Sequence, residues 1–248
     1  MSGHSKWATI KHKKGAADAK RGQIFTKLIK EISIAARLGG GDANSNPRLR
    51  TAVLKARTAN MPKDNIDRAI KKGLGELDGV SYTEITYEAY GPGGVAILVD
   101  VLTDNKNRTA ADIRYILNKG GGNLGEAGSV SYLFKRKGII GFDSTKYTED
   151  QILEVALDAG AEDVSTEGTT IEVTTEPDDF EKVLGALEKA GFAHSSAEIT
   201  KVADSYITLE NEKTGKVIRL IENLDNHDDV QSVSSNIDIP DDYTPSEE

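Results

Sequence analysis

The chain contains no cysteine, and it has only one tryptophan, two methionines and four histidines among its 248 residues. The lack of cysteine excludes disulfides, thiolate metal sites and cysteine nucleophiles, and it fits a reducing compartment. No apolar run approaches the roughly 18 residues of a membrane-spanning helix, and the polar, basic N-terminus does not resemble a signal peptide. The sequence therefore predicts a soluble, cytoplasmic protein with no membrane partner.

Enzymatic chemistry has little support in the sequence. The four histidines, His4, His12, His194 and His227, do not have the spacing of metal ligands. Residues 120–125 match the pattern G-x-G-x-x-G, but a dinucleotide fingerprint follows a strand and opens a helix. This stretch follows a predicted helix and leads to a strand, so it is read as a helix stop and a turn. We expect no enzyme, no metal and no cofactor.

Charge is abundant and is divided between two regions. Residues 1–75 contain 17 Lys+Arg and 5 Asp+Glu, whereas the remainder contains 14 and 35. The net charge of −9 therefore conceals a basic head of +12 and an acidic body of −21. A basic segment of this kind is typical of nucleic-acid binders. The acidic body would repel phosphate, so we expect contact at one end of the molecule.

The basic head is predicted to consist of an arm and three helices. Residues 1–15 lack a helical apolar stripe, whereas apolar residues recur at three- and four-residue spacing over 16–38. Asn46 and Pro47 form a typical helix start, and a third helix is expected over 62–73. The outer positions of these helices carry Lys20, Arg21, Lys27, Lys30, Arg48, Arg50, Lys55, Arg57, Lys63, Arg68, Lys71 and Lys72.

The remainder is predicted to be mixed helix and strand. Residues 135–204 follow a βαββαβ pattern, which is the ferredoxin-like order. The flanking segments 79–134 and 205–240 supply ββαβ and βαβ, and neither makes a complete layered domain alone. We therefore predict an α+β fold: an N-terminal three-helix bundle followed by two ferredoxin-like α+β domains, one inserted in the other. The basic arm and bundle would occupy 1–78, and an acidic tail would occupy 241–248.

Within the discontinuous domain, residues 82–90 and 95–102 are predicted strands joined by a Gly-Pro-Gly-Gly turn. A helix is expected over 107–119, and another strand over 129–134. In the inserted domain, Pro177 is predicted to open the second helix.

Nucleic-acid contact is predicted for the arm and the bundle. Trp7 could stack on an unpaired base, which is typically worth ~1–3 kcal/mol, or it could anchor the arm against the bundle. Asp104 and Asn105 are candidate helix caps, and the cations that follow them form the one basic cluster of the acidic body, a candidate secondary contact. The predicted nucleic-acid-binding residues are Lys6, Trp7, Lys11, His12, Lys13, Lys14, Lys20, Arg21, Lys27, Arg48, Arg50, Lys55, Arg57, Lys63, Arg68, Lys71, Lys72, Lys106, Arg108 and Arg114.

A series of ordered motifs spans nearly the whole chain: SGHSKW (2–7), IKHKK (10–14), NPRLR (46–50), NMPKDNI (60–66), YGPGGV (90–95), TDNKNRT (103–109), GGNLG (121–125), DDVQ (228–231) and SN (235–236). Together these motifs resemble the YebC/PmpR family, which includes the mitochondrial translational activator of cytochrome oxidase. The chain departs from the family at Thr9 and Ala89, where Asn and Gly are commoner, and neither position carries charge.

The resemblance implies a cytosolic protein with a helical bundle and two α+β domains, and neither an enzymatic activity nor a cofactor. Some members are described as probable DNA-binding transcriptional regulators, whereas others act in translation on the ribosome or messenger RNA. The leading hypothesis is a nucleic-acid-binding regulator of gene expression, a probable DNA-binding transcriptional regulator.

Two alternatives remain open. A ribosome- or RNA-associated translation factor is favoured by the lack of a clear helix-turn-helix with a polar recognition helix, and by an aromatic within a basic arm, which suits splayed RNA bases. The third hypothesis is a protein–protein adaptor whose acidic body binds a protein partner.

Overall fold

The computed structural model describes the backbone of residues 17–240 and 243, and the side chains from residue 21 onward. The basic head forms a bundle of α2 (Ala17–Gly39), α3 (Pro47–Thr58) and α4 (Lys63–Gly73). Its core contains Ile32, Leu49, Ala52 and Ile66. The helices predicted over 16–38 and 62–73 are therefore confirmed within the described residues, and so is the helix predicted to start at Asn46 and Pro47.

Asn46 explains why α3 begins where it does. Its side-chain oxygen accepts a hydrogen bond from the Leu49 N–H at 3.1 Å, and Pro47 occupies the first turn, where a missing N–H costs nothing. The Asn46 amide also donates to the carbonyl oxygen of Ala35 at 2.8 Å. One buried side chain thus caps α3 and ties it to α2.

The discontinuous domain has a four-stranded sheet with two helices on one face. The strand order is β3-β1-β2-β9, and all neighbours are antiparallel. Leucine, valine and isoleucine side chains from both helices pack on β1 and β2 to form one core. The elements are β1 (Thr83–Tyr90), β2 (Ala96–Thr103), α5 (Lys106–Lys119), β3 (Asn123–Leu124), α8 (Asn211–Asp225) and β9 (Val230–Ser235), with a short parallel pair of β8 (Ile207–Thr208) and β10 (Ile237–Asp238) beside them.

The inserted domain has its own sheet and core. The strand order is β5-β6-β4-β7, again antiparallel throughout, and the core contains Phe142, Ile152, Ile171 and Leu187. Its elements are β4 (Phe134–Asp143), α6 (Glu149–Ala159), β5 (Asp163–Glu167), β6 (Thr170–Thr175), α7 (Phe180–Lys189) and β7 (Ser196–Ala203). The predicted βαββαβ order is confirmed, while the exact domain boundaries stay a prediction.

The two sheets share one spatial arrangement. In the inserted sheet, β4 connects through α6 to the parallel strand β5, and β6 fills the gap between them. In the discontinuous sheet, β2 connects through α5 to β3, and β1 fills the gap. The strand after the second helix then pairs with the strand before the first helix: β7 pairs with β4, and β9 pairs with β2. The discontinuous domain is therefore a ferredoxin-like sheet whose gap-filling strand comes first along the chain instead of third.

Two predictions about local structure are wrong. Residues 129–134 are not a strand, because a 3₁₀ turn occupies Ser131–Leu133 and β4 begins only at Phe134. The Glu88 carboxylate accepts hydrogen bonds from the N–H groups of Gly128, Val130 and Ser131 at 2.6–2.8 Å, which curls this segment and withdraws those donors from strand pairing.

Pro177 does not open α7. It lies in a turn in which the Asp179 N–H donates to the Glu176 carbonyl oxygen at 3.2 Å, and the helix begins at Phe180. A proline whose φ angle suits a first helical turn suits a β-turn equally well.

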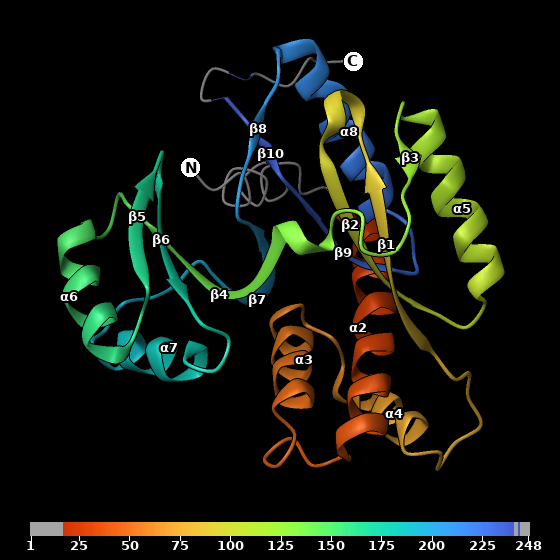
Figure 1. The fold of residues 1–248 in the computed structure, drawn as a ribbon. Helices are drawn as coiled ribbons and strands as arrows, with labels where there is room; N and C mark the ends of the chain where they lie inside the picture. Colours follow the sequence, from red (N-terminus) through yellow and green to blue (C-terminus); the bar gives the residue numbers. More distant parts are fainter. Residues whose placement is uncertain (1–16, 241–242, 244–248) are drawn as a thin grey trace.

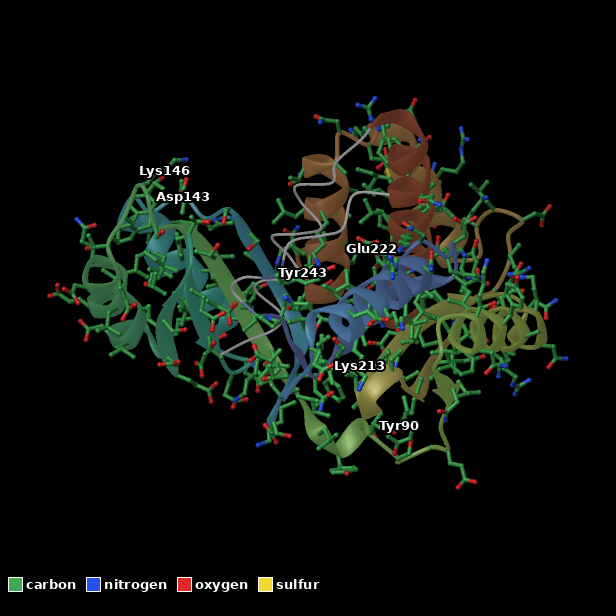
Figure 2. All side chains as sticks on the ribbon, turned by 90° about the horizontal axis from the view of Figure 1, so that it is seen from above. Tyr90, Asp143, Lys146, Lys213, Glu222 and Tyr243 are labelled. Atoms are coloured by element: carbon green, nitrogen blue, oxygen red, sulfur yellow. The ribbon has the colours of Figure 1, made fainter. Side chains whose placement is uncertain are left out.

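The bundle and the inserted domain both contact the discontinuous domain (Figure 1). The N-terminal half of α2 reaches the loop between α8 and β9, where Gln23 Nε2 donates to the Asn226 carbonyl oxygen at 3.2 Å. The inserted domain lies to one side, connected through β4 and β7, and Lys201 Nζ forms an ion pair with Asp100 at 2.6 Å. Seen from above, the inserted domain, marked by Asp143 and Lys146, lies to the left of the other two parts (Figure 2).

Replacing Gly138 by alanine is expected to destabilise the inserted domain. A Cβ at this position of β4 would collide with Thr175 Oγ1 and the ring of Phe180, so a strand or a helix would have to move. Overpacking of this kind typically costs about 1–3 kcal/mol. Urea denaturation followed by circular dichroism measures the change.

Gly185→Ala is the matched control for this variant. Gly185 lies within α7 of the same domain, and a Cβ there meets no atom within 4 Å. Alanine is favoured over glycine in a helix by about 0.5–1 kcal/mol, so this variant should be at least as stable as the parent chain. Equal stability of the two variants would contradict the packing around Gly138.

Candidate nucleic-acid interface

Part of the predicted interface lies outside the described residues. The backbone of α2 includes Lys20, but its side chain is not among those described. The predictions that fall wholly outside concern Lys6, Trp7, Lys11, His12, Lys13 and Lys14.

Several of the predicted phosphate ligands are paired with groups of the same chain. Arg48 on α3 donates to Glu31 at 2.7 Å and to Glu84 of β1 at 2.5 Å. Lys27 Nζ donates to the Asp225 carbonyl oxygen at 2.5 Å. The contacts with Glu84 and Asp225 join the bundle to the discontinuous domain, so both cations have a structural role.

Arg50 and Lys55 reach from α3 to the inserted domain. Arg50 Nη2 donates to both carboxylate oxygens of Glu181 on α7, at 2.7 and 2.9 Å. Lys55 Nζ lies 3.6 Å from Glu198 Oε2 on β7. All four side chains are substantially exposed, and exposed ion pairs are typically worth about 0.2–1 kcal/mol. A competing anion could therefore displace either carboxylate at little cost.

Lys30 is buried, so its predicted place on the outer surface of the bundle is wrong. Only 7% of the residue is exposed. Its ammonium group donates to Asp229 Oδ1 at 2.5 Å and to the Asp228 carbonyl oxygen at 2.9 Å. The other carboxylate oxygen of Asp229 accepts from Arg108 at 2.9 Å and from Thr109 at 2.7 Å.

The segment 103–109 is therefore largely structural. Asn105 caps α5 by accepting a hydrogen bond from the Arg108 N–H at 3.1 Å, and Arg108 and Thr109 both hold Asp229. Arg108 also forms an ion pair with Asp104 at 2.8 Å. Three cations were predicted to form the secondary contact. Lys106 and Arg114 are the two that are exposed and form no ion pair within the described residues.

The surroundings of Asp229 keep it ionised. Burial alone would raise the pKa of this carboxyl group, but hydrogen bonds from Lys30, Thr109 and Arg108 together hold its pKa far below the ordinary value. This centre was not predicted from the sequence. Its only signal there was the position of Asp229 within the motif at 228–231, since the partner Lys30 is 199 residues away.

An open cleft of about 530 Å³ borders this centre, between α2 and the discontinuous domain, with Thr26, Tyr82 and His227 in its lining. His227 Nδ1 accepts the Asp229 N–H at 3.1 Å, so its proton resides on Nε2, which lies 3.3 Å from an Asp112 oxygen. Both ring nitrogens are thus engaged, and His227 is suited to holding the loop in place.

Five other predicted cations are exposed and unpaired. Arg57 lies in the last turn of α3, and Lys63, Arg68, Lys71 and Lys72 lie on α4. In the described part of the chain, none of the five forms an ion pair or a side-chain hydrogen bond. They are the bundle side chains that can receive phosphate without first giving up an internal partner.

The charge on α4 is not uniform. Asp64 and Asp67 are exposed on the same outer face as the four cations, which leaves an excess of two positive charges. Arg21 on α2 is also exposed, but it has an interaction with another group of the chain.

Within 17–240 and 243, no group of three His, Asp or Glu side chains is arranged to hold a metal ion. No helix in the described range is long and apolar enough to cross a membrane.

Comparisons with known proteins cover almost the whole chain. A family model described as the TACO1/YebC protein N-terminal domain matches residues 5–76. A second model, described as the TACO1/YebC second and third domain, matches residues 82–237.

Individual relatives are similar over their full length. A protein of Treponema denticola is 64% identical over 98% of both chains, and one of Desulforapulum autotrophicum is 59% identical over 97% of this chain and 98% of that one. Both are named "Probable transcriptional regulatory protein". The crystal structure of a conserved hypothetical protein from Aquifex aeolicus, 47% identical, superposes with a TM-score of 0.82 and covers 91% of this chain and 93% of that one.

Replacing Asp229 by asparagine is expected to destabilise the junction between the bundle and the discontinuous domain. The variant leaves the buried ammonium of Lys30 without a counter-charge, and breaking a buried ion pair in this way typically costs about 3–5 kcal/mol. Urea denaturation at neutral pH measures the loss. Asp112→Asn, which alters a half-exposed carboxylate beside the same cleft, is the control and should change stability by less than about 1 kcal/mol.

The pH dependence of stability has a definite sign. Because the folded pKa of Asp229 lies below the unfolded value of about 3.9, its contribution is complete above that pH and is lost as the pH falls towards the folded pKa. The parent chain should lose this contribution below about pH 4, whereas Asp229→Asn should lack that part of the acid dependence. Identical acid profiles would contradict the assignment.

Proposed function

This chain belongs to the TACO1/YebC family, and from that membership we propose that it is a nucleic-acid-binding regulator of gene expression. Control of transcription through DNA is the leading form of the proposal, because the relatives described above are named probable transcriptional regulatory proteins. The observation that carries the proposal is the set of five exposed, unpaired cations on α3 and α4.

These cations would act by attracting phosphate. Arginine and lysine that neutralise phosphates release condensed counterions, so affinity falls steeply with salt. The basic segment 1–16 precedes α2 and contributes Lys6, Lys11, Lys13 and Lys14 to the same end of the chain. If about six phosphates are neutralised, the log–log slope of affinity against salt should be near −5 on duplex DNA.

The acidic domains would set the orientation of binding. The inserted segment 135–204 contains 7 Lys+Arg and 16 Asp+Glu. A domain of this charge repels a polyanion, so nucleic acid would approach from the side that faces away from the inserted domain. We propose no chemical reaction and no cofactor for this protein, and we place its activity in the cytoplasm.

The choice between DNA and RNA depends on groups that read bases. Contacts to phosphate position a protein but carry no sequence information, and α4 offers mainly such contacts. Binding to ribosomal or messenger RNA is therefore the second candidate function. It predicts association with ribosomal particles, whereas control of transcription predicts a preferred duplex sequence.

A triple variant, Arg68→Gln, Lys71→Gln and Lys72→Gln, is expected to weaken binding to all nucleic acids alike. Each lost phosphate contact should lower the magnitude of the log–log salt slope by about 0.9 on duplex DNA, hence by about 2.7 for three. Fluorescence anisotropy with a labelled duplex over a range of NaCl concentrations measures both the affinity and the slope.

The control carries the same change of charge elsewhere. Lys146→Gln, Lys182→Gln and Lys189→Gln remove three exposed cations from the inserted domain, and this variant should keep the parent slope. If the two triple variants behave alike, the effect is one of net charge and the proposed interface on α4 is wrong.

Glu181→Gln and Glu198→Gln together should strengthen binding. They free Arg50 and Lys55 of α3 from the inserted domain, and two exposed pairs worth about 0.2–1 kcal/mol each correspond to an affinity gain of roughly 2- to 30-fold. The matched control combines Glu188→Gln on α7 with Glu149→Gln on α6, carboxylates that do not contact the bundle. An equal gain in the control would mean that only the overall charge matters.

A further inference from the structure

The discontinuous domain is acidic as a whole, and α5 is its one helix with an excess of positive charge, because α8 carries three cations and three carboxylates. Residues 79–134 and 205–240 contain 13 Asp+Glu and 7 Lys+Arg, and four of those seven cations lie on α5. The helix has a single carboxylate, Asp112. This local reversal of charge is what a polyanion would recognise on an otherwise repulsive surface.

An exposed aromatic ring stands within this basic stretch. Tyr115 is 65% exposed, and the Lys119 ammonium lies 6.0 Å from the centre of its ring. Arg114 precedes it, and Ala111 and Asn118 follow the same outer face at helical spacing. The small side chain of Ala111 leaves the ring of Tyr115 accessible from the N-terminal side.

The one carboxylate of the helix is engaged by a neighbour. Asp112 lies 3.3 Å from His227 Nε2 in the loop after α8. Arg108 is held by Asp104 and Asp229, as described above. The cations of α5 that remain for a ligand are Lys106, Arg114 and Lys119.

The flank of α5 that carries Arg108 and Asp112 lies near α2, across the loop between α8 and β9. Asp112 contacts His227, and the adjacent Asn226 accepts a hydrogen bond from Gln23 of α2. Both views place α5 on the opposite side of the discontinuous domain from the inserted one (Figures 1 and 2). A strand bound along α5 would therefore continue towards the basic end of the chain and away from the most acidic part.

We propose that the outer face of α5 binds a single-stranded segment of RNA, with one base stacked on Tyr115 and the flanking phosphates on Arg114 and Lys119. Stacking requires a base whose face is free, which RNA loops and ends provide and duplex DNA does not. Asn118 can donate to or accept from a base edge or a 2′-hydroxyl. The site rests on the proposed function, because one stacked base and its flanking phosphates would need the additional phosphate contacts of α3 and α4 for useful affinity.

The test is anisotropy titration of the full chain with a labelled, unstructured single-stranded RNA, with the single-stranded DNA of the same sequence, and with the DNA duplex. Tyr115→Ala should weaken RNA binding by about 5- to 150-fold, the equivalent of losing one stacked base, without changing the salt slope. Tyr115→Phe should restore binding, since it keeps the ring. Arg114→Gln with Lys119→Gln should instead lower the magnitude of the slope by about 0.7 per lost contact.

Tyr132→Ala is the matched control. Tyr132 is 72% exposed in the turn before β4, and no cation lies over its ring in the described part of the chain. This variant should bind RNA like the parent chain, and far-ultraviolet circular dichroism confirms that all variants are folded.

The outcomes separate the site from the proposed function. If Tyr115→Ala binds RNA like the parent while the α4 triple variant loses affinity, the proposed function stands and the α5 site is wrong. An equal loss on single-stranded DNA would overturn the assignment to RNA. If neither variant changes the binding of any probe, both proposals fail.

Discussion

The carboxylate of Asp229 joins three parts of the chain at one buried point. It receives the buried ammonium of Lys30 from α2, the guanidinium of Arg108 and the hydroxyl of Thr109 from α5, and it lies immediately before β9. A buried carboxylate is stable only when its hydrogen-bonding capacity is filled. Together with the contacts of Gln23, Lys27 and Arg48, this centre holds the bundle against the discontinuous domain.

Pairing between cations of the basic head and carboxylates of the acidic body occurs at several other places in the structure. Part of the opposite charge is used internally: Arg48, Arg50 and Lys55 each connect α3 to a carboxylate of another domain. Counting cations therefore overstates the surface that is left for a ligand. The positive surface that remains for a ligand is smaller than the number of cations suggests, and it is concentrated on α4 and along α5.

Most of the fold could be predicted because it depends on local patterns. The spacing of apolar residues located all three bundle helices, and turn residues separated the strands of the inserted domain in the correct order. The strand predicted over 129–134 was wrong because the carboxylate of Glu88, about 40 residues away, determines the conformation of this segment. The partners of Lys30 and Arg50 lie 199 and 131 residues away, so no local signal separated the structural cations from the exposed ones.

The chain order of the discontinuous sheet has a consequence for how the protein is made. Strand β2 pairs with β9, so Val101 cannot form its pair until Val230 has been synthesised. Every strand of the inserted sheet, in contrast, lies between Phe134 and Ala203. Contacts this distant in sequence form slowly, and domains fold as units while the chain is synthesised. The inserted domain can therefore be complete on the ribosome while β1 and β2 still expose an unpaired edge. Folding of the inserted domain places Phe134 beside Ala203, and therefore brings the two segments of the discontinuous domain close together. This proximity reduces the loop that must close when β9 pairs with β2.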